Sequence, residues 1–345
     1  MAIFAIGGSV PAHAAVITAA CNNTASDAAT IQSAITSSAM GDEITIQGSC
    51  LINATIKLLG GRTYQGQNRV DTVLKQASGA NLPAILASDS WVANTTATGL
   101  PIVLRDLTID GNKSANPTAG DALVIRSWDT TIEDLEVLNS NGDGIKITNK
   151  SQNGTALTGT QVNGTIQNVY VSQSGADGIR VEDSGNSVTD WNLLDSRISS
   201  SGNDAINLDN AAGWVVERNH VYGNGAAGIS ARRLFASSIS DNYIEDFNTS
   251  GITATVQGDA ASVIMGNRIF QFSGTGTTFL GITQVNYGTG EVAVTGNVIR
   301  GGGTGTGLSY QRGSNQLTVT STGNLVQNVA TPRSAGAGVV LATAY

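Results

Sequence analysis

One short motif recurs nine times along this chain of 345 residues, and it constrains the fold more than any other feature. Each copy has a Gly or Ala, in most cases after a polar or small residue, and then alternating apolar residues. The copies are GDALVI (120–125), GDGIKI (142–147), ADGIRV (176–181), NDAINL (203–208), AAGISA (226–231), TSGITA (249–254), FLGITQ (279–284), GTGLSY (305–310) and GAGVVL (336–341). Successive copies start 22 to 34 residues apart, a period typical of solenoids, in which each repeat packs only on its neighbours.

The alternation within each copy predicts a short strand. In GDGIKI, Ile145 and Ile147 point to one face and Lys146 to the other. A coil of a parallel β-helix needs about 22 residues, and longer steps leave room for loops. Gly, Asn, Ser and Thr stand where long helices would have Leu, Lys and Glu, and only 13% of residues are charged. We therefore expect an all-β fold, a single-stranded right-handed parallel β-helix of about ten coils.

A second column of polar residues supports this register, because its steps are similar to those of the repeated motif. Its members are Asp106, Asp134, Asn168, Ser196, Asn219, Asn242, Asn267, Asn297 and Asn324. Stacked Asn side chains bond to one another along a coil axis, and Asn tolerates tight turns. We expect these residues to form one line along the molecule.

The N-terminal part has a different pattern. Residues 1–15 are mostly apolar and include the small-x-small sequence Ala12-His13-Ala14, so we expect a residual signal peptide there and a single β-helix domain over residues 16–345. Ser26 would cap a short helix with Ile31 and Ile35 on one face. Such a helix would cover the open end of the stack.

Cysteine content and charge limit the compartment and the partners. Cys21 and Cys50 are expected to pair, and with the leader they predict a secreted, bacterial protein. The net charge of −8 argues against a nucleic-acid partner, but a local basic patch would still accept an acidic polysaccharide. No segment is long enough to span a membrane. We expect a polysaccharide or oligosaccharide substrate and no membrane partner, and homo-oligomer formation is left open.

The residue before Gly-Ile is acidic in four consecutive copies, at Asp121, Asp143, Asp177 and Asp204. Equivalent residues of adjacent coils lie about 4.8 Å apart, so the carboxylates repel and some of their pKa values rise. Raised pKa values suit acid/base catalysis. Neighbouring coils match a retaining carboxylate pair and alternate coils approach an inverting one, so the stereochemistry stays open. The alternative is that Asp before Gly only forms a turn, which explains Asp204, before Ala, least well.

The same coils concentrate the outward charge. We expect the catalytic residues to be Asp177, Asp204, Asp143 and Glu182, and the substrate-binding residues to be Lys146, Arg180, Asp209, Arg232, Arg233 and Trp214. In the coils that follow, the same positions are mostly Ser and Thr. The alternatives are a surface salt-bridge ladder for the charges and packing at a coil corner for Trp214. With two Cys and two His, no metal site is expected.

The layout resembles the pectate lyase and polygalacturonase superfamily of right-handed parallel β-helix proteins. The resemblance rests on DAATIQSAI (27–35), followed by a strand, a Gly-rich turn and Tyr64-Gln65-Gly66, and it covers nearly the whole chain. Asn141-Gly142-Asp143-Gly144 resembles the NTDG motif of polygalacturonases. Gly202-Asn203-Asp204-Ala205 stands where their DD motif would be, with one Asp missing. Gly225-Ala226-Ala227-Gly228 has no His in place of their GHG, and only the Arg of RIK is present, at Arg180, in an earlier coil. These departures put polygalacturonase activity in doubt, and fold alone does not decide function.

Three functions follow from these patterns. The first is a secreted carbohydrate-active enzyme that cleaves or transfers glycosidic bonds, with Asp177 and Asp204 as the reacting pair. The second is a polysaccharide lyase with a Lys or Arg base and no cofactor other than Ca²⁺, which Asp177, Glu182, Asp204 and Asp209 would bind. The third is a non-enzymatic glycan-binding or tailspike-like β-helix.

Overall fold

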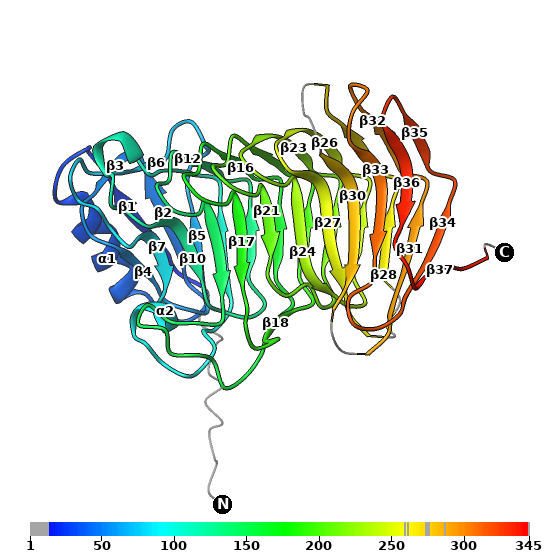
Figure 1. Cartoon of the computed structure of the whole chain (residues 1–345). Coiled ribbons are helices and arrows are strands. Elements are labelled where there is room, and N and C mark those ends of the chain that lie inside the picture. Colours follow the sequence, from blue (N-terminus) through cyan, green and yellow to red (C-terminus); the bar gives the residue numbers. More distant parts are fainter. Residues whose placement is uncertain (1–13, 259, 261, 273–276, 286–287, 344–345) are drawn as a thin grey trace, which may run out of the picture.

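The structure is a computed structural model that describes residues 14–343 except 259, 261, 273–276 and 286–287. It is an all-β parallel coil whose strands stack from a helix at the N-terminal end to the last strands at the other end (Figure 1). Three sheets run along the stack, and the pairings between their strands are parallel. The stack has about 12 turns, slightly more than the ten expected. The leader expected at residues 1–15 lies almost wholly outside the described residues.

Sheet 1 has 13 strands. They are β1 (Val16–Ala20), β2 (Glu43–Gln47), β5 (Arg62–Gln65), β8 (Ile102–Arg105), β11 (Thr131–Glu133), β15 (Thr165–Gln167), β19 (Asn192–Leu194), β22 (Val215–Glu217), β25 (Ser238–Ser240), β28 (Ser262–Met265), β31 (Gly290–Thr295), β34 (Leu317–Thr322) and β37 (Val339–Leu341).

Sheet 2 has 11 strands. They are β3 (Ser49–Ile52), β6 (Val73–Gln76), β9 (Thr108–Asp110), β12 (Glu136–Leu138), β16 (Tyr170–Ser172), β20 (Arg197–Ser199), β23 (His220–Asn224), β26 (Tyr243–Phe247), β29 (Arg268–Phe270), β32 (Val298–Arg300) and β35 (Leu325–Gln327).

Sheet 3 also has 11 strands. They are β4 (Ile56–Leu58), β7 (Ala84–Ser88), β10 (Asp121–Ile125), β13 (Ile145–Thr148), β17 (Ile179–Glu182), β21 (Ile206–Leu208), β24 (Ile229–Leu234), β27 (Ser250–Val256), β30 (Thr278–Gln284), β33 (Thr306–Gln311) and β36 (Thr331–Ala335). A small sheet of β14 (Gln161–Val162) and β18 (Val188–Thr189) joins two loops.

The core is one continuous column of apolar side chains inside the coil. Ile145 pairs with Ile179, and Ile179 with Ile206, and all three are fully buried. The alternation predicted for sheet 3 is therefore confirmed. Because a coil cannot bury its apolar face alone, each coil depends on its neighbours.

The ladder of Asn side chains is confirmed from Asn219 to Asn324. Asn219 Nδ2 donates to Asn242 Oδ1 at 3.0 Å, and the same bond repeats from Asn242 to Asn267, Asn297 and Asn324. The side chains also bond to backbone groups of adjacent coils, which satisfies buried amides that would otherwise be costly.

The first three members of the expected column do not belong to this ladder. Strand pairing aligns the ladder position of Ser196 with Val169 and Leu135. Asp134 and Asn168 lie one residue earlier, at the turn between sheets 1 and 2, where their φ angles are 53° and 49°; Asp106 occupies the same turn position, with a φ of 60°. In these coils the ladder position is apolar, and Asp or Asn appears instead where the turn requires the left-handed conformation.

Two copies of the repeated motif also fall out of line. Ser250 pairs with Thr278, so Phe279, and not Gly281, is equivalent to Gly251. The last copy, GAGVVL, contributes β37 to sheet 1, while β36 holds the corresponding place in sheet 3.

The N-terminal end is covered by α1 (Asp27–Ser37), as expected (Figure 1). Ile31 and Ile35 lie on the inner face of α1 and are fully buried. The Ser26 hydroxyl makes no capping bond. The carboxylate of Asp27 instead accepts the backbone N–H groups of Thr24 and Leu51, because it points into the loop that joins the helix to the stack. Burial raises the pKa of Asp27, but these bonds outweigh it and the pKa is lowered.

The expected disulfide between Cys21 and Cys50 is present and closes 29 residues of sequence separation. Two short helices lie elsewhere, α2 (Asp89–Val92) and the 3-10 turn η1 (Lys113–Ala115). Among the described residues, no helix is long and apolar enough to cross a membrane.

Candidate functional site

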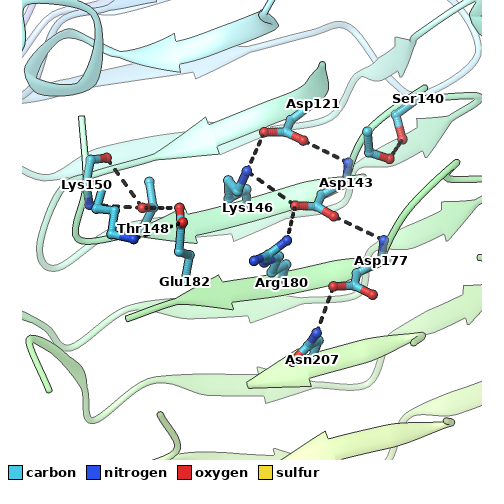
Figure 2. A network of polar contacts seen from close by, with 11 residues as sticks. Asp121, Ser140, Asp143, Lys146, Thr148, Lys150, Asp177, Arg180, Glu182 and Asn207 are labelled. Atoms are coloured by element: carbon cyan, nitrogen blue, oxygen red, sulfur yellow. Dashed lines mark hydrogen bonds and ion pairs between the residues drawn. The ribbon is translucent and has the colours of Figure 1, made fainter. Parts of the chain in front are cut away.

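The acidic column lies on sheet 3, in the register expected from the sequence. Each Asp uses Oδ1 to accept the backbone N–H of the equivalent residue in the next coil. Asp121 accepts from Asp143 at 2.8 Å and Asp143 from Asp177 at 3.1 Å (Figure 2), and Asp177 accepts from Asp204 at 3.0 Å. Asp204 accepts the N–H of Ala227 at 2.8 Å. One oxygen of every carboxylate is therefore committed to joining coils, and the surroundings of the other oxygen differ from coil to coil.

The glycines beside this column permit the close approach of the coils. A Cβ atom at Gly178 would lie 2.6 Å from the carbonyl oxygen of Ala205. Gly follows Asp143 and Asp177 in the sequence for this steric reason, as well as for the turn that the Asp-Gly pair was expected to form.

Lys146 connects two of the carboxylates. Its Nζ lies 2.9 Å from Asp121 Oδ2 and 3.4 Å from Asp143 Oδ2 (Figure 2). Arg180, one coil further, places Nη1 3.9 Å from the same Asp143 oxygen. Lys146 and Arg180 pair in register on β13 and β17, so the cationic column is confirmed over these two coils, and Asn207 continues it on β21.

Burial and neighbouring charges shift the pKa values of Asp143 and Lys146. Burial, reinforced by the charge of Asp121, raises the pKa of Asp143 to about 6, although Lys146 opposes the shift. Burial lowers the pKa of Lys146, but the charges of Asp121 and Asp143 outweigh it and the pKa is raised. Lys146 is therefore a fixed cation at neutral pH, and Asp143 titrates close to neutrality.

The side chains of Asp177 and Asp204 differ in exposure and in hydrogen bonding. Asp177 is only 3% exposed, and its Oδ2 accepts a bond of 2.8 Å from Asn207 Nδ2. Asp204 is partly exposed, and its Oδ2 makes no hydrogen bond in the described residues. Burial, with a contribution from the charge of Asp177, raises the pKa of Asp204. Asp204 is therefore suited to carry a proton, beside a carboxylate held by two donors.

Glu182 lies at the other end of β17, away from the acidic column. It accepts the Thr148 hydroxyl at 3.0 Å and lies 3.4 Å from Lys150 Nζ. Burial raises the pKa of Glu182, but Lys146 and the Thr148 bond outweigh it and lower the pKa. The carboxylate stays ionised, and the strand register places it in one column with Asp209 and Arg232. The side chains of Asp209 and Arg232 lie 3.8 Å apart.

Two predicted substrate-binding residues lie elsewhere. Trp214 is fully buried, its ring stacks on Trp191 with centroids 5.8 Å apart, and its Nε1 donates to the Val188 carbonyl. Its ring is closed to a sugar, which corrects the expectation in favour of corner packing. Arg233 sits at a bulge of β24 with a φ of 57° and donates to Gln257, so it leaves the column that Arg232 continues.

Sequence reasoning missed Arg126, which occupies the position equivalent to Thr148. It is fully buried and donates to the carbonyls of Ser90 and Thr155. Burial lowers its pKa. Arg126 also donates to the Ala97 carbonyl, so it ties α2 and the loop after it to the loop of residues 150–164. The Thr158 N–H donates to the Thr96 carbonyl and joins the same two loops directly. In the sequence, the one signal for this role is a charged residue directly after an apolar strand.

The four carboxylates considered for Ca²⁺ do not converge. Both oxygens of Asp177 are engaged, Glu182 is paired with Lys150, and Asp209 faces Arg232. Within the described part of the chain, no group of three or more His, Cys, Asp or Glu side chains is placed to hold a metal ion. The residues present do not fit a calcium site, and no chemical step is assigned to one.

Comparisons with known proteins agree with the fold. Residues 185–344 match the model of the family described as "Right handed beta helix region". No curated protein matches the sequence. Among solved structures, the A-module of mannuronan C-5 epimerase AlgE4 from Azotobacter vinelandii superposes with a TM-score of 0.68 at 17% identity, over 93% of this chain and 97% of that one.

Two further structures show the range of proteins with this fold. An alginate lyase from Paenibacillus sp. str. FPU-7 has a TM-score of 0.53 at 16% identity, over 91% of this chain and 99% of that one. Tailspike protein 2 of the Escherichia coli O157:H7 bacteriophage CAB120 has a TM-score of 0.63 at 13% identity, over 86% of this chain and 40% of that one. Identities this low establish architecture alone. With its three parallel sheets and these matches, the chain is a right-handed parallel β-helix protein.

Proposed function

We propose that the protein is an exported carbohydrate-active enzyme that cleaves or transfers glycosidic bonds of an acidic polysaccharide on the outward face of β13, β17 and β21. The observation that carries the proposal is the cluster of Lys146, Asp143 and Arg180, in which a carboxyl with a pKa of about 6 lies under two cations. A cluster of charged groups with shifted pKa values is typical of a chemical site.

The cations support an acidic substrate. The side chains of Arg180 and Arg232 are 39% and 60% exposed and are able to bind a sugar carboxylate through charge-assisted bonds. Two similar structures are named as a mannuronan epimerase and an alginate lyase, and these names fit the same class of substrate.

The carboxylates support a reaction at the glycosidic bond. Asp204, with its raised pKa and its free oxygen, would protonate the leaving oxygen, and Asp177 on the adjacent coil would act as the carboxylate partner. Coil spacing puts these residues about 4.8 Å apart, which suits a retaining pair.

A second candidate is β-elimination, in which a base removes the proton from the carbon next to the uronate carboxylate. A C=C bond forms, the C–O bond to the glycosidic oxygen breaks, and that oxygen takes up a proton from water. The raised pKa of Lys146 keeps it protonated, so it would neutralise the substrate carboxylate, while Asp143 would be the base. This differs from the Lys or Arg base expected from the sequence.

The test is a screen of the protein against alginate, polygalacturonate and dextran that measures both reducing ends and near-ultraviolet absorbance. We expect new reducing ends with an acidic polymer, and a rate at least about 100-fold lower for Asp204→Asn and Asp177→Asn. Asn keeps one oxygen to accept the N–H of the next coil, and thermal unfolding of both variants checks that they are folded. Asp241→Asn, an exposed turn residue on another part of the stack, is the control and should keep the full rate.

Two outcomes decide against the first candidate. Full activity in both Asn variants excludes Asp177 and Asp204 as the reacting pair. An unsaturated product with every reducing end establishes elimination instead.

A further inference from the structure

Sheet 2 carries a row of stacked aromatic rings that the sequence patterns did not single out as a site. The rings belong to Tyr222, His220, Tyr243, Phe270 and Phe272, which we call the aromatic strip. Their centroids are 4.7 Å apart from Tyr222 to His220 and from His220 to Tyr243, 5.6 Å from Tyr243 to Phe270, and 5.0 Å from Phe270 to Phe272. Aromatic residues make up only 5% of the chain, so this concentration on β23, β26 and β29 calls for a cause.

Three exposed arginines lie over the aromatic strip. The Cζ atoms of Arg197, Arg268 and Arg300 are 5.9, 5.1 and 5.6 Å from the ring centroids of Tyr222, Tyr243 and Phe272. None of the ion pairs formed by the described residues includes them. Their guanidinium groups are held over the rings by cation–π contacts, and their hydrogen-bonding edges remain available for an anion.

One acidic residue, Glu245, lies among the rings, and its carboxylate contacts two of them. Glu245 accepts from Tyr243 Oη at 2.9 Å and lies 2.9 Å from His220 Nε2. The three arginines outnumber Glu245 and the nearby Asp246, so the surface of the aromatic strip carries net positive charge, although the whole chain has a net charge of −8.

The surface is also hollowed at one end. Arg268, Phe270, Phe272, Val298 and Arg300 line a depression of about 270 Å³. Phe272 is 58% exposed and Val298 43% exposed. Apolar rings left in water, flanked by unpaired cations, are an unfavourable surface unless a ligand covers them.

We propose that the aromatic strip with Arg197, Arg268 and Arg300 is a second carbohydrate-binding surface, which holds a chain of uronate sugars along the coil axis. The exposed edges of the rings and the Val298 side chain would contact the apolar faces of the sugars, and each arginine would pair with a carboxylate through two parallel bonds. Adjacent coils are about 4.8 Å apart, so Arg268 and Arg300, on neighbouring coils, suit charges repeated along one polymer. The proposal does not depend on the reaction assigned to sheet 3.

The test is affinity electrophoresis of the full chain in gels that contain alginate or dextran. The double variant Arg268→Gln with Arg300→Gln should weaken the alginate Kd tenfold or more, and Phe272→Ala should weaken it severalfold. Dextran should not retard the protein, and added salt should weaken the binding of alginate. Matched controls are Arg333→Gln, an exposed arginine at the end of sheet 3, and Phe235→Ala, a half-exposed ring outside the aromatic strip, and both should bind within twofold of the wild type.

To exclude alginate binding by sheet 3, the assay is repeated in a background in which every protein also carries Arg180→Gln and Arg232→Gln. The proposal holds if this background still binds alginate and loses that binding when Arg268 and Arg300 are changed. It is overturned if the background does not bind, if the strip variants bind as the wild type does, if Arg333→Gln weakens binding equally, or if dextran binds as well as alginate. Thermal unfolding of each variant shows that it is folded. Turnover is measured separately, so failure of the enzymatic proposal leaves this result intact.

Discussion

Each Asp of the column on sheet 3 performs two tasks with its two oxygens. Oδ1 accepts a backbone N–H of the next coil, and Oδ2 faces Lys146 in Asp121 and Asp143, or Asn207 in Asp177. The turn-forming and chemical interpretations of these residues are therefore compatible. The structural task explains why the residue type repeats, while burial, reinforced by the charge of a neighbouring carboxylate, raises the pKa of Asp143 and of Asp204.

Asp143 makes stability depend on pH. Its pKa is raised from 3.8 to about 6 in the folded protein, so the native state holds a proton that the unfolded state has released. The stability due to this proton is fully present below about pH 4 and is lost as the pH rises through about 6. Relative to Asp143→Asn, which cannot ionise, the wild type should lose about 1 to 3 kcal/mol between about pH 4 and pH 7. Urea unfolding of both proteins at several pH values measures this, and a difference that does not vary with pH contradicts it.

The residue just before each strand of sheet 2 is of a different type in the two halves of the stack. Before β19 the position that begins sheet 2 is apolar, as in Leu135 and Val169, which are buried. From Asn219 onward it is an Asn whose amide bonds to the coils on both sides. The preceding turn residue has a positive φ in both parts. The start of sheet 2 is thus stabilised by apolar burial in the first half of the stack and by hydrogen bonds of the Asn ladder in the second half.

Removal of one ladder amide should be costly. Asn242 donates to Val216 and Asn267 and accepts from Asn219, so Asn242→Ala leaves several buried polar groups unpaired. We expect a loss of about 2 to 4 kcal/mol in the free energy of unfolding. Asn248→Ala, at an exposed residue with one bond to the Gly225 carbonyl, should change stability by less than about 0.5 kcal/mol. Equal effects in guanidinium unfolding would show that the ladder contributes nothing special.

At the scale of the whole molecule, stability passes from coil to coil. The strand contacts are strongest between adjacent coils, and α1 ends the stack by packing on β1, β3 and β4. The disulfide from Cys21 to Cys50 attaches the loop before α1 to β3. The end coil, which has a neighbour on one side only, is where such a bond has the greatest effect.

The disulfide should therefore stabilise the capped end. The double variant Cys21→Ala with Cys50→Ala is expected to lower the free energy of unfolding by about 2 to 4 kcal/mol. Hydrogen exchange should show the loss of protection concentrated in β1, α1 and β3, with the coils from β21 onward unchanged. A uniform loss along the stack would contradict the coil-by-coil picture.

Much of the architecture follows from local pattern. The alternation of apolar residues, the copies of the motif from Gly120 to Thr253 and the Asn residues from 219 to 324 are local signals, and they predicted the sheets, the core and the ladder. The acidic column and the adjacent column of Lys146 and Arg180 followed from the same register. This register held because a slip of one residue would turn every apolar side chain outward.

What the sequence by itself determined is the coil, its inward face and the order of residues in each column. Only the tertiary structure decided which atoms meet across coils: that Trp214 stacks inside on Trp191, that Asp177 is held while Asp204 keeps a free oxygen, and that Arg126 joins two loops. The aromatic strip is also set by the tertiary structure, because successive rings of His220, Tyr243 and Phe270 are 23 and 27 residues apart in sequence. Parallel pairing brings such residues into contact, and the loop lengths that set this pairing carry no periodic signal.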